Sequence, residues 1–185
     1  MRKKRAFWTK IVVLPFLLLG LIGCGSGKRE FLPQLLSPFS CRVTGECGGE
    51  AFTATVTAGE WKLGEDGVQE RSLQVIYTAP KHLCGLVATL EADGCTLTLD
   101  GMKISDAHLD GFLLPARLLG DAFAVTNTLV QKQEGREVCV VVGGSENGSR
   151  QVTVDGESGV ILFVEGTLHG IYAEFSVEGL EGLEQ

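Results

Sequence analysis

Six cysteines and three histidines are the residues of this chain best suited to metal or redox chemistry, and their spacing decides whether they could perform it. No C-x-x-C pair occurs, which argues against a thioredoxin-like redox centre and against a zinc ribbon. The histidines form no H-x-H or H-E-x-x-H pair of the kind that holds zinc, and two of them neighbour predicted turns. We therefore expect no metal, no cofactor and solvated imidazoles at His82, His108 and His169.

Serine and the acidic residues offer no catalytic arrangement either. Ser145 follows Gly143-Gly144, but the glycine that a nucleophile elbow needs two residues after its serine is missing. No phosphate-binding glycine motif precedes a helix. The acidic stretches at Glu65-Asp66-Gly67 and Asp155-Gly156-Glu157 lack the alternating ligands of an EF-hand loop and are expected to form turns. Because no nucleophile, base and orienting group are arranged together, the sequence predicts a protein that is not an enzyme.

Charge separates a basic leader from an acidic body. Five basic residues and no acidic residue precede position 11. Without residues 1–23, the chain has 162 residues with 11 Lys and Arg against 23 Asp and Glu, a formal charge of −12. This length suits one domain with a substantial core. Such an acidic body would be repelled by a phosphate backbone, so nucleic acid is not an expected partner.

The leader has the layout of an export signal. Its apolar stretch, Ile11 to Ile22, is about a dozen residues long, whereas a membrane-spanning helix needs about 20. Leu21-Ile22-Gly23-Cys24 then resembles the bacterial lipobox, in which a lipid is attached to the cysteine thiol and the chain is cut before it. The resemblance implies a signal peptide at 1–23 and a mature chain that begins with acylated, for example palmitate-bearing, Cys24.

Lipidation would fix where the protein acts. Two or three acyl chains give stable membrane anchoring, so the body is expected at the extracytoplasmic face of the cell membrane. Gly25-Ser26-Gly27 begins a flexible tether that extends through residue 38, and residues 39–185 form the single domain. The alternative is an ordinary signal peptide in which Cys24 is a coincidence.

The body reads as a series of antiparallel hairpins. Six Asp-Gly or Asn-Gly pairs provide the positive φ angles that tight turns need, and runs rich in Val, Thr, Leu and Ile lie between them. The pairs are Asp66-Gly67, Asp93-Gly94, Asp100-Gly101, Asp110-Gly111, Asn147-Gly148 and Asp155-Gly156. Further strands are expected at 73–78, 137–142, 150–154, 160–165 and 167–177. One short helix is expected at 114–123, because Pro115 suits a first helical turn and Gly120 weakens the helix.

Two hairpins can be assigned a register, because one register places apolar residues on one face and polar residues on the other. With Gly48-Gly49 as a two-residue loop, Cys41 lies opposite Val56. With Asp93-Gly94 as the loop, Leu90 lies opposite Leu97. The other apolar pairs that follow are Phe39–Ala58, Val43–Ala54, Ala88–Leu99 and Ala92–Cys95, and the polar pairs are Glu91–Thr96 and Thr89–Thr98.

These hairpins bear on the five cysteines of the body. Cys41, Cys84 and Cys95 are interpreted as small buried hydrophobic residues on the apolar faces. Cys84 and Cys95 would be roughly 26 Å apart along the sheet, and Cys41 and Cys47 about 20 Å apart. A disulfide tolerates only roughly 4.4–6.8 Å between Cα atoms, so neither pair is expected to be bonded.

The chain resembles the LolA-like envelope proteins. The resemblance rests on the segments 73–80, 114–120, 152–159 and 171–177, with Tyr77 and Pro80 near the end of a strand and Pro115 before the mid-chain helix. It implies a mainly β fold, in which a curved, incompletely closed antiparallel sheet, a half-barrel, carries one or two short helices over its concave, apolar side. The carriers of that family have an arginine-proline element before this strand, whereas Arg71 is followed here by Ser72-Leu73.

Two functional classes remain open. The first is a binding protein that holds a lipid or another hydrophobic ligand in a concave groove. Its candidate wall residues are Trp61, Tyr77, Leu114, Leu118, Leu119 and Phe123. Alternatively, these residues are ordinary core. The second class is a scaffold or regulatory lipoprotein that grips another envelope protein, through an edge strand or through its acidic surface.

Overall fold

The computed structural model describes residues 35, 37–63, 69–91, 94–121, 124–145 and 147–183. All of them belong to one compact unit of the chain, Phe31–Gln185. The predicted signal peptide, Cys24 and most of the tether lie outside the described residues, as does Phe123, one of the candidate groove residues.

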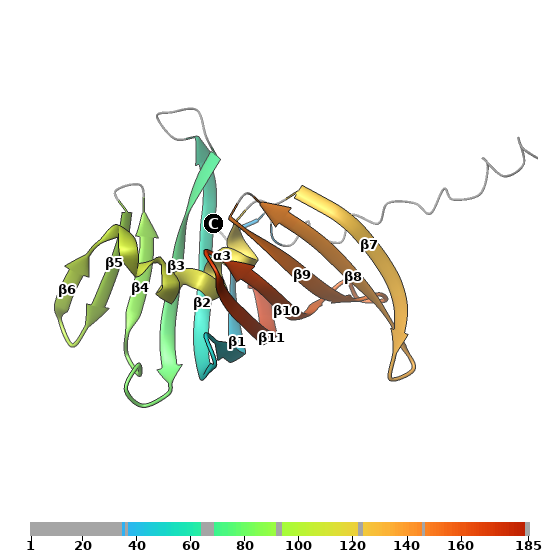
Figure 1. Cartoon of the computed structure of the whole chain (residues 1–185), viewed down its shortest axis with the longest axis horizontal. Helices are drawn as coiled ribbons and strands as arrows, with labels where there is room; N and C mark the ends of the chain where they lie inside the picture. The colour runs from blue at the N-terminus through green and yellow to red at the C-terminus, as the bar shows by residue number, and fades with distance from the viewer. Residues whose placement is uncertain are drawn as a thin grey trace, which may run out of the picture. The chain divides into compact units, whose positions relative to one another are not determined.

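The described residues form one large antiparallel sheet. Its strands are β1 (Phe39–Cys47), β2 (Glu50–Leu63), β3 (Gln69–Ala79), β4 (Val87–Glu91), β5 (Gly94–Leu99), β6 (Met102–Ser105), β7 (Ala124–Gln133), β8 (Arg136–Ser145), β9 (Gly148–Asp155), β10 (Ile161–Leu168) and β11 (Ile171–Gly182). The spatial order is β6-β5-β4-β3-β2-β1-β11-β10-β9-β8-β7 (Figure 1). Because β6 and β7 are the two ends of this order, the sheet is open, and the predicted open antiparallel β fold is confirmed.

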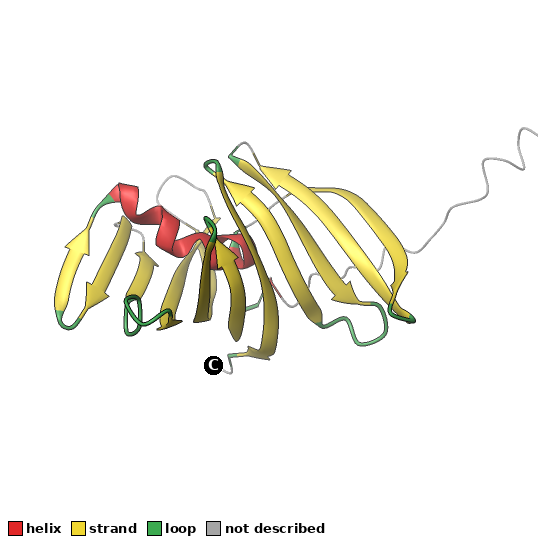
Figure 2. Ribbon diagram, turned by 60° about the horizontal axis from the view of Figure 1, so that its bottom comes forward, coloured by secondary structure: helices red, strands yellow, loops and turns green. Residues whose placement is uncertain are grey.

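The strand order explains why a helix crosses the sheet. The chain runs outward from β1 to the edge strand β6 and must next begin β7 at the opposite edge. The connection contains a 3-10 helix, η1 (Ala107–Leu113), and an α-helix, α3 (Leu114–Gly120). It contacts β2, β3, β10 and β11, and Figure 2 shows it running across the curved sheet. We call the face that α3 covers the inner face.

Alternating side chains give the inner face its core. In β1, β2, β3 and β11, every second residue is buried under the helices, as the period of a strand requires. Threonines of β2 occupy the opposite, outer face. The largest fully buried side chains include Phe39, Phe175, Leu73, Leu113, Leu114 and Leu119. The core therefore lies between the middle of the sheet and the two short helices.

The first predicted hairpin is confirmed in full. Phe39 pairs with Ala58, Cys41 with Val56 and Val43 with Ala54. Gly48 and Gly49 have φ angles of 60° and 84°, which suit a two-residue hairpin loop.

The second hairpin forms with a different register. Leu90 pairs with Cys95 rather than Leu97, and Glu91 pairs with Gly94, so the two linking residues are 92 and 93 instead of Asp93-Gly94. The shift equals two residues, which preserves the face of every side chain because the strand period is two. Periodicity therefore predicted the faces correctly and the partners incorrectly.

Two other predictions need correction at element ends, and two strands were missed. The expected strand 167–177 is two strands, because the chain turns at His169 and Gly170, whose φ angles are 50° and 79°. The expected helix 114–123 ends at Gly120, and Asp121 is already extended. Strands β6 and β7 were not predicted.

The cysteines follow the sheet only in part. Cys41 and Cys95 are buried on the inner face, as predicted, and burial raises the pKa of Cys41 to about 12. Cys84 is exposed, so its predicted burial is wrong. It lies in the turn after β3, where the Gly85 N–H donates to the carbonyl of Tyr77 at 2.9 Å. Cys41, Cys47, Cys84 and Cys95 are free thiols.

Candidate ligand-binding site

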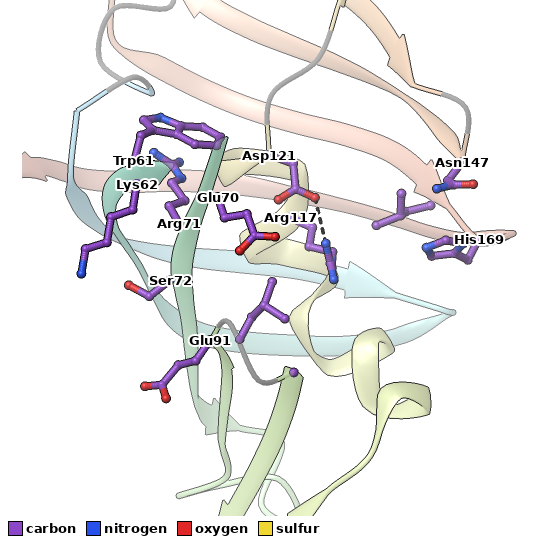
Figure 3. Close-up of a pocket in the computed structure, with 13 residues that line it drawn as sticks. Trp61, Lys62, Glu70, Arg71, Ser72, Glu91, Arg117, Asp121, Asn147 and His169 are labelled. Atoms are coloured by element: carbon purple, nitrogen blue, oxygen red, sulfur yellow. Dashed lines mark hydrogen bonds and ion pairs between the residues drawn. The ribbon is translucent and has the colours of Figure 1, made fainter. Parts of the chain in front are cut away.

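A cavity of about 880 Å³ opens beside the C-terminal end of α3, where β2 ends and β3 begins (Figure 3). Trp61 and Arg71 line it from the sheet, Arg117 and Asp121 line it from the end of the helix, and the turns after β8 and β10 complete it. It is therefore a mixed site, with one aromatic wall and several charged groups.

A β-bulge places Trp61 in this cavity. Ala58 pairs with Leu73 and Trp61 pairs with Arg71, so β2 has one more residue than β3 over this stretch. Without the extra residue, Glu60 would face Arg71 and Trp61 would point to the outer face. Bulges of this kind redirect side chains and are frequent next to binding sites.

Arg71 lies on the inner face because β3 alternates. It shares that face with Leu73, Val75 and Tyr77, and only 8% of its surface is exposed. Its guanidinium carbon lies 4.7 Å from the centroid of the Trp61 ring and 5.2 Å from that of Phe39. Its Nη1 donates to the carbonyl of Leu35 at 2.9 Å.

Burial also acts on the charge of Arg71. It lowers the pKa of Arg71 to about 10, and the nearby Asp121 carboxylate opposes that shift. The side chain is therefore a cation held by aromatic rings and one carbonyl, with little water around it.

Arg117 ties the end of α3 to the preceding 3-10 helix. Its Nη2 donates to both carboxylate oxygens of Asp110, at 3.0 and 2.9 Å, and its Nη1 donates to Asp121 at 3.2 Å. Burial works against the charged form, but these two carboxylates outweigh it and raise the pKa of Arg117. Figure 3 shows the pair of Arg117 with Asp121 facing the cavity.

Arg150 holds the other side of the same helix end. It lies on the inner face of β9, and its Nη1 donates to the carbonyl of Leu118. Its Nη2 donates to the carbonyl of Asp121 at 2.6 Å. Burial lowers the pKa of Arg150 to about 9, the Asp121 carboxylate raises it and the charge of Arg71 lowers it. Carbonyls at a helix end lack partners within the helix, so this arginine caps α3.

Four buried N–H groups at the cavity have no hydrogen-bond partner among the described residues. They are Nε1 of Trp61, Nε and Nη2 of Arg71, and Nε of Arg117. All four are donors. Burying an unsatisfied polar group costs roughly 1–3 kcal/mol, and such groups are rare in folded proteins. The site thus has more donors than acceptors.

The predicted groove residues separate into two groups. Trp61 is half-buried and lines the cavity. Leu114, Leu118 and Leu119 are buried in the core, at 2%, 4% and 0% exposure, and are not part of the cavity wall. Tyr77 is buried as well, and its hydroxyl donates to the carbonyl of Phe112 at 2.9 Å.

The histidines and acidic residues add no second site. His82 is exposed and lies 2.9 Å from Glu50, and His169 is exposed in the turn between β10 and β11. Within the described ranges, no group of three or more His, Cys, Asp or Glu side chains is close enough to hold a metal ion. None of the helices in that part of the chain has the length and apolar character needed to cross a membrane.

The sequence indicated Trp61 as a wall residue, but its analysis missed the arginines of the site. Arg71 and Arg150 each lie at an inward position of an alternating strand, and that position was a usable signal. Nothing local indicated that Arg117 and Asp121 would meet them.

Comparison with known proteins finds distant likenesses only. No protein-family model and no curated protein match the sequence. An uncharacterized conserved protein from Thermus thermophilus is 12% identical, with a TM-score of 0.49 over 85% of this chain and 88% of its own. A LolA-superfamily protein from Nitrosomonas europaea is 7% identical, with a TM-score of 0.42 over 85% and 94%. The Mycobacterium tuberculosis lipoprotein LppX is 11% identical, with a TM-score of 0.42 over 92% and 98%. Identities this low leave the function to be inferred from the chain's own residues.

Proposed function

We propose that this chain is a non-catalytic, LolA-like binding protein of the cell envelope, anchored through acyl chains on Cys24 at the extracytoplasmic face of the membrane. Its ligand is a lipid or another hydrophobic molecule with a polar end, taken into the cavity beside Trp61. The leader, with its basic start, short apolar stretch and Leu21-Ile22-Gly23-Cys24, supports the anchoring.

The observation that carries the binding role is the cavity itself. It combines an aromatic wall at Trp61 with buried donors on Arg71 that lack partners. Ligand sites are concave, partly apolar and fitted with a few directed polar groups, and this cavity meets that description. A groove lined by the leucines of α3 is not needed, because those leucines fill the core.

Mass spectrometry of the chain, gently purified from its native membranes, tests this proposal. A stoichiometric small amphiphile, lost in a variant with Trp61→Ala, is expected. The matched control is Tyr172→Ala, which removes an exposed aromatic ring on another part of the sheet. Protein that never carries an amphiphile, even after incubation with membrane lipid extract, would contradict the proposal.

A second candidate function, the gripping of another envelope protein, is favoured by strand β7. All ten residues of β7 are exposed, including the large apolar Val125, Leu129 and Val130. It pairs only with β8 among the described strands and forms one end of the sheet order. A long, exposed edge strand is a ready template for an added strand of another chain.

A photo-crosslinking residue at Val130 tests this second role in the native envelope. Strand addition predicts one defined protein adduct, which disappears when Lys132→Pro removes an N–H that points away from β8. The same crosslinker at Thr96, on the outer face of β5, serves as the control. Adducts of equal yield at both positions would indicate random contact.

A further inference from the structure

The unpartnered groups of the cavity specify the chemistry of the ligand's polar end. We infer that this end is an oxyanion, a carboxylate or a phosphate, received by Arg71 with help from the N–H groups of Trp61 and Arg117. The inference deepens the proposed function, since it assumes that the cavity binds an amphiphile, and it names the class to which that amphiphile belongs.

Arg71 presents the edge of the guanidinium that oxyanions prefer. Nε and Nη2 form one edge of the planar group, and their N–H bonds run nearly parallel, so two oxygens of one anion can accept them together. These two atoms are the ones without partners, whereas Nη1 is used by the Leu35 carbonyl. The side chain is more than nine-tenths buried, so water does not replace the missing acceptor easily.

The surroundings of Arg71 fix the plane of this fork. The rings of Trp61 and Phe39 both lie within 5.2 Å of the guanidinium carbon. Aromatic rings pack against the faces of a guanidinium and leave its edges for hydrogen bonds. The ordering cost of a bidentate contact is therefore reduced before a ligand arrives.

Gly120 packs directly against the fork of Arg71. A Cβ added at this glycine would lie 3.1 Å from Nη2 and 3.4 Å from Nε of Arg71, as well as 2.5 Å from Cδ2 of Leu73. Any larger residue would therefore crowd the donors.

The remaining charges agree with an anion deep in the site. Among the charged residues of the cavity wall, Lys62, Glu70 and Glu91 are exposed, so their charges are solvated at the rim. The Asp121 carboxylate is engaged by Arg117. Nε1 of Trp61 and Nε of Arg117 supply two further donors, and neither has a partner. The inner wall thus lacks an acceptor for its donors, and an anion would supply it.

The fluorescence of Trp61 gives a direct test. Trp8 and Trp61 are the two tryptophans of the chain, and Trp8 lies in the signal peptide that we propose is removed. The processed protein, or the precursor with Trp8→Phe, therefore reports on the cavity alone. Purified in neutral maltoside micelles, it is titrated with octanoate, octyl phosphate, octyl glucoside and inorganic phosphate. We expect saturable changes in emission with the two anionic amphiphiles and none with the neutral one.

Substitution identifies the receiving group. Arg71→Met keeps the length and the ring contacts of the side chain but removes the fork, and is expected to weaken the anionic amphiphiles about tenfold or more. Arg42→Met removes one positive charge from the exposed outer face of β1 and should change nothing. If Arg71→Met unfolds, Trp61→Phe provides a second variant. Trp61→Phe removes one donor and keeps a ring. Because this variant lacks the fluorescent reporter, its ligand binding is measured as the rise in melting temperature that each ligand produces, in comparison with the unaltered chain.

Each outcome decides between the two claims. Equal binding of octyl glucoside and octanoate, unchanged by Arg71→Met, would support the binding function but would contradict the inference that the polar end of the ligand is an oxyanion. Binding of inorganic phosphate as tightly as octyl phosphate would support an oxyanion site but would contradict the proposal that the ligand is an amphiphile. Octanoate and octyl phosphate together separate a fatty-acid carboxylate from a phosphate headgroup. No response to any of the four probes would overturn both claims.

Discussion

Arg71 and Arg150 lie on the same inner face, and both are more than nine-tenths buried. Arg71 belongs to β3 and Arg150 to β9, and four strands separate these two in the sheet order. Burial lowers the pKa of each, and the Asp121 carboxylate opposes that shift in both cases. They differ in what their N–H groups reach. Both Nη atoms of Arg150 donate to carbonyls at the end of α3, whereas the Nε and Nη2 edge of Arg71 donates to nothing. Burial of an arginine is therefore a poor indicator of a site, and a whole guanidinium edge without acceptors is a better one.

The largest expected effect tests the structural half of this comparison. Arg150→Met leaves the carbonyls of Leu118 and Asp121 buried without donors, and two hydrogen bonds from a charged group are lost. We expect the free energy of unfolding to fall by about 3 kcal/mol, measured by denaturant titration. Arg42→Met is again the control, and an effect of Arg150→Met no larger than the control's would mean that Arg150 does not hold the helix.

The second largest effect is expected on ligand affinity when the fork of Arg71 is crowded. Gly120→Ala places a methyl group against Nε and Nη2 of Arg71, and we expect affinity for octanoate to fall about tenfold, equivalent to about 1.4 kcal/mol. The free energy of unfolding should fall by about 1 to 3 kcal/mol as well, because the same methyl group would lie 2.5 Å from Cδ2 of the buried Leu73. Unaltered affinity in a folded Gly120→Ala protein would place the ligand elsewhere in the cavity.

The stability of Arg71→Met sharpens the contrast with Arg150. The bond to the Leu35 carbonyl and the cation–π contacts with Trp61 and Phe39 are lost, but the unpartnered donors disappear with the charge. These effects oppose one another, so the free energy of unfolding should change by at most about 1 kcal/mol. Thermal and urea unfolding at neutral pH measure it. A loss as large as that of Arg150→Met would assign Arg71 a structural role.

The smallest effect concerns Asp121. Asp121→Asn keeps the main-chain carbonyl that Arg150 binds but removes a negative charge near Arg71. Affinity for octyl phosphate should rise by a factor of roughly two to five, since a like charge is removed from a partly buried site. The titration is repeated with octyl glucoside, whose response should stay the same. A fall in octyl phosphate affinity would show that Asp121 positions Arg117 rather than repelling the ligand.

How far the sequence predicts the fold depends on which interactions are local. The positive φ angles of Gly48 and Gly49 are required by the turn itself and by no distant contact, and the pairs of this hairpin were predicted correctly. The second hairpin was predicted with the right faces and the wrong partners, because a shift of two residues keeps the pattern of apolar and polar side chains. Strands β6 and β7 were missed because their exposed residues carry no burial pattern.

The candidate site shows the same division. Trp61 was named for its ring, yet strict alternation along β2 would have placed it on the outer face. The bulge between Ala58 and Trp61 depends on pairing with β3 and turns the ring inward. The leucines of α3 were named for a groove and are core, because the helix lies directly on the sheet.

What the sequence determined by itself is the set of properties that repeat along a strand. A period of two placed Arg71 and Arg150 on the face that also carries Leu73 and Val152, and no knowledge of distant contacts is needed for that. What only the tertiary structure decided is which hydrogen-bond partners each guanidinium reaches. The carbonyl of Leu118 reaches Arg150 across 32 positions of sequence, because the chain must cross the sheet from β6 to β7. The helix α3 of the same crossing ends at Gly120, beside the fork of Arg71, and the described residues of the crossing bring no acceptor to that fork. Hydrogen-bond partners depend on where a distant segment lies to within a few tenths of an ångström, and strand periodicity carries no information of that kind.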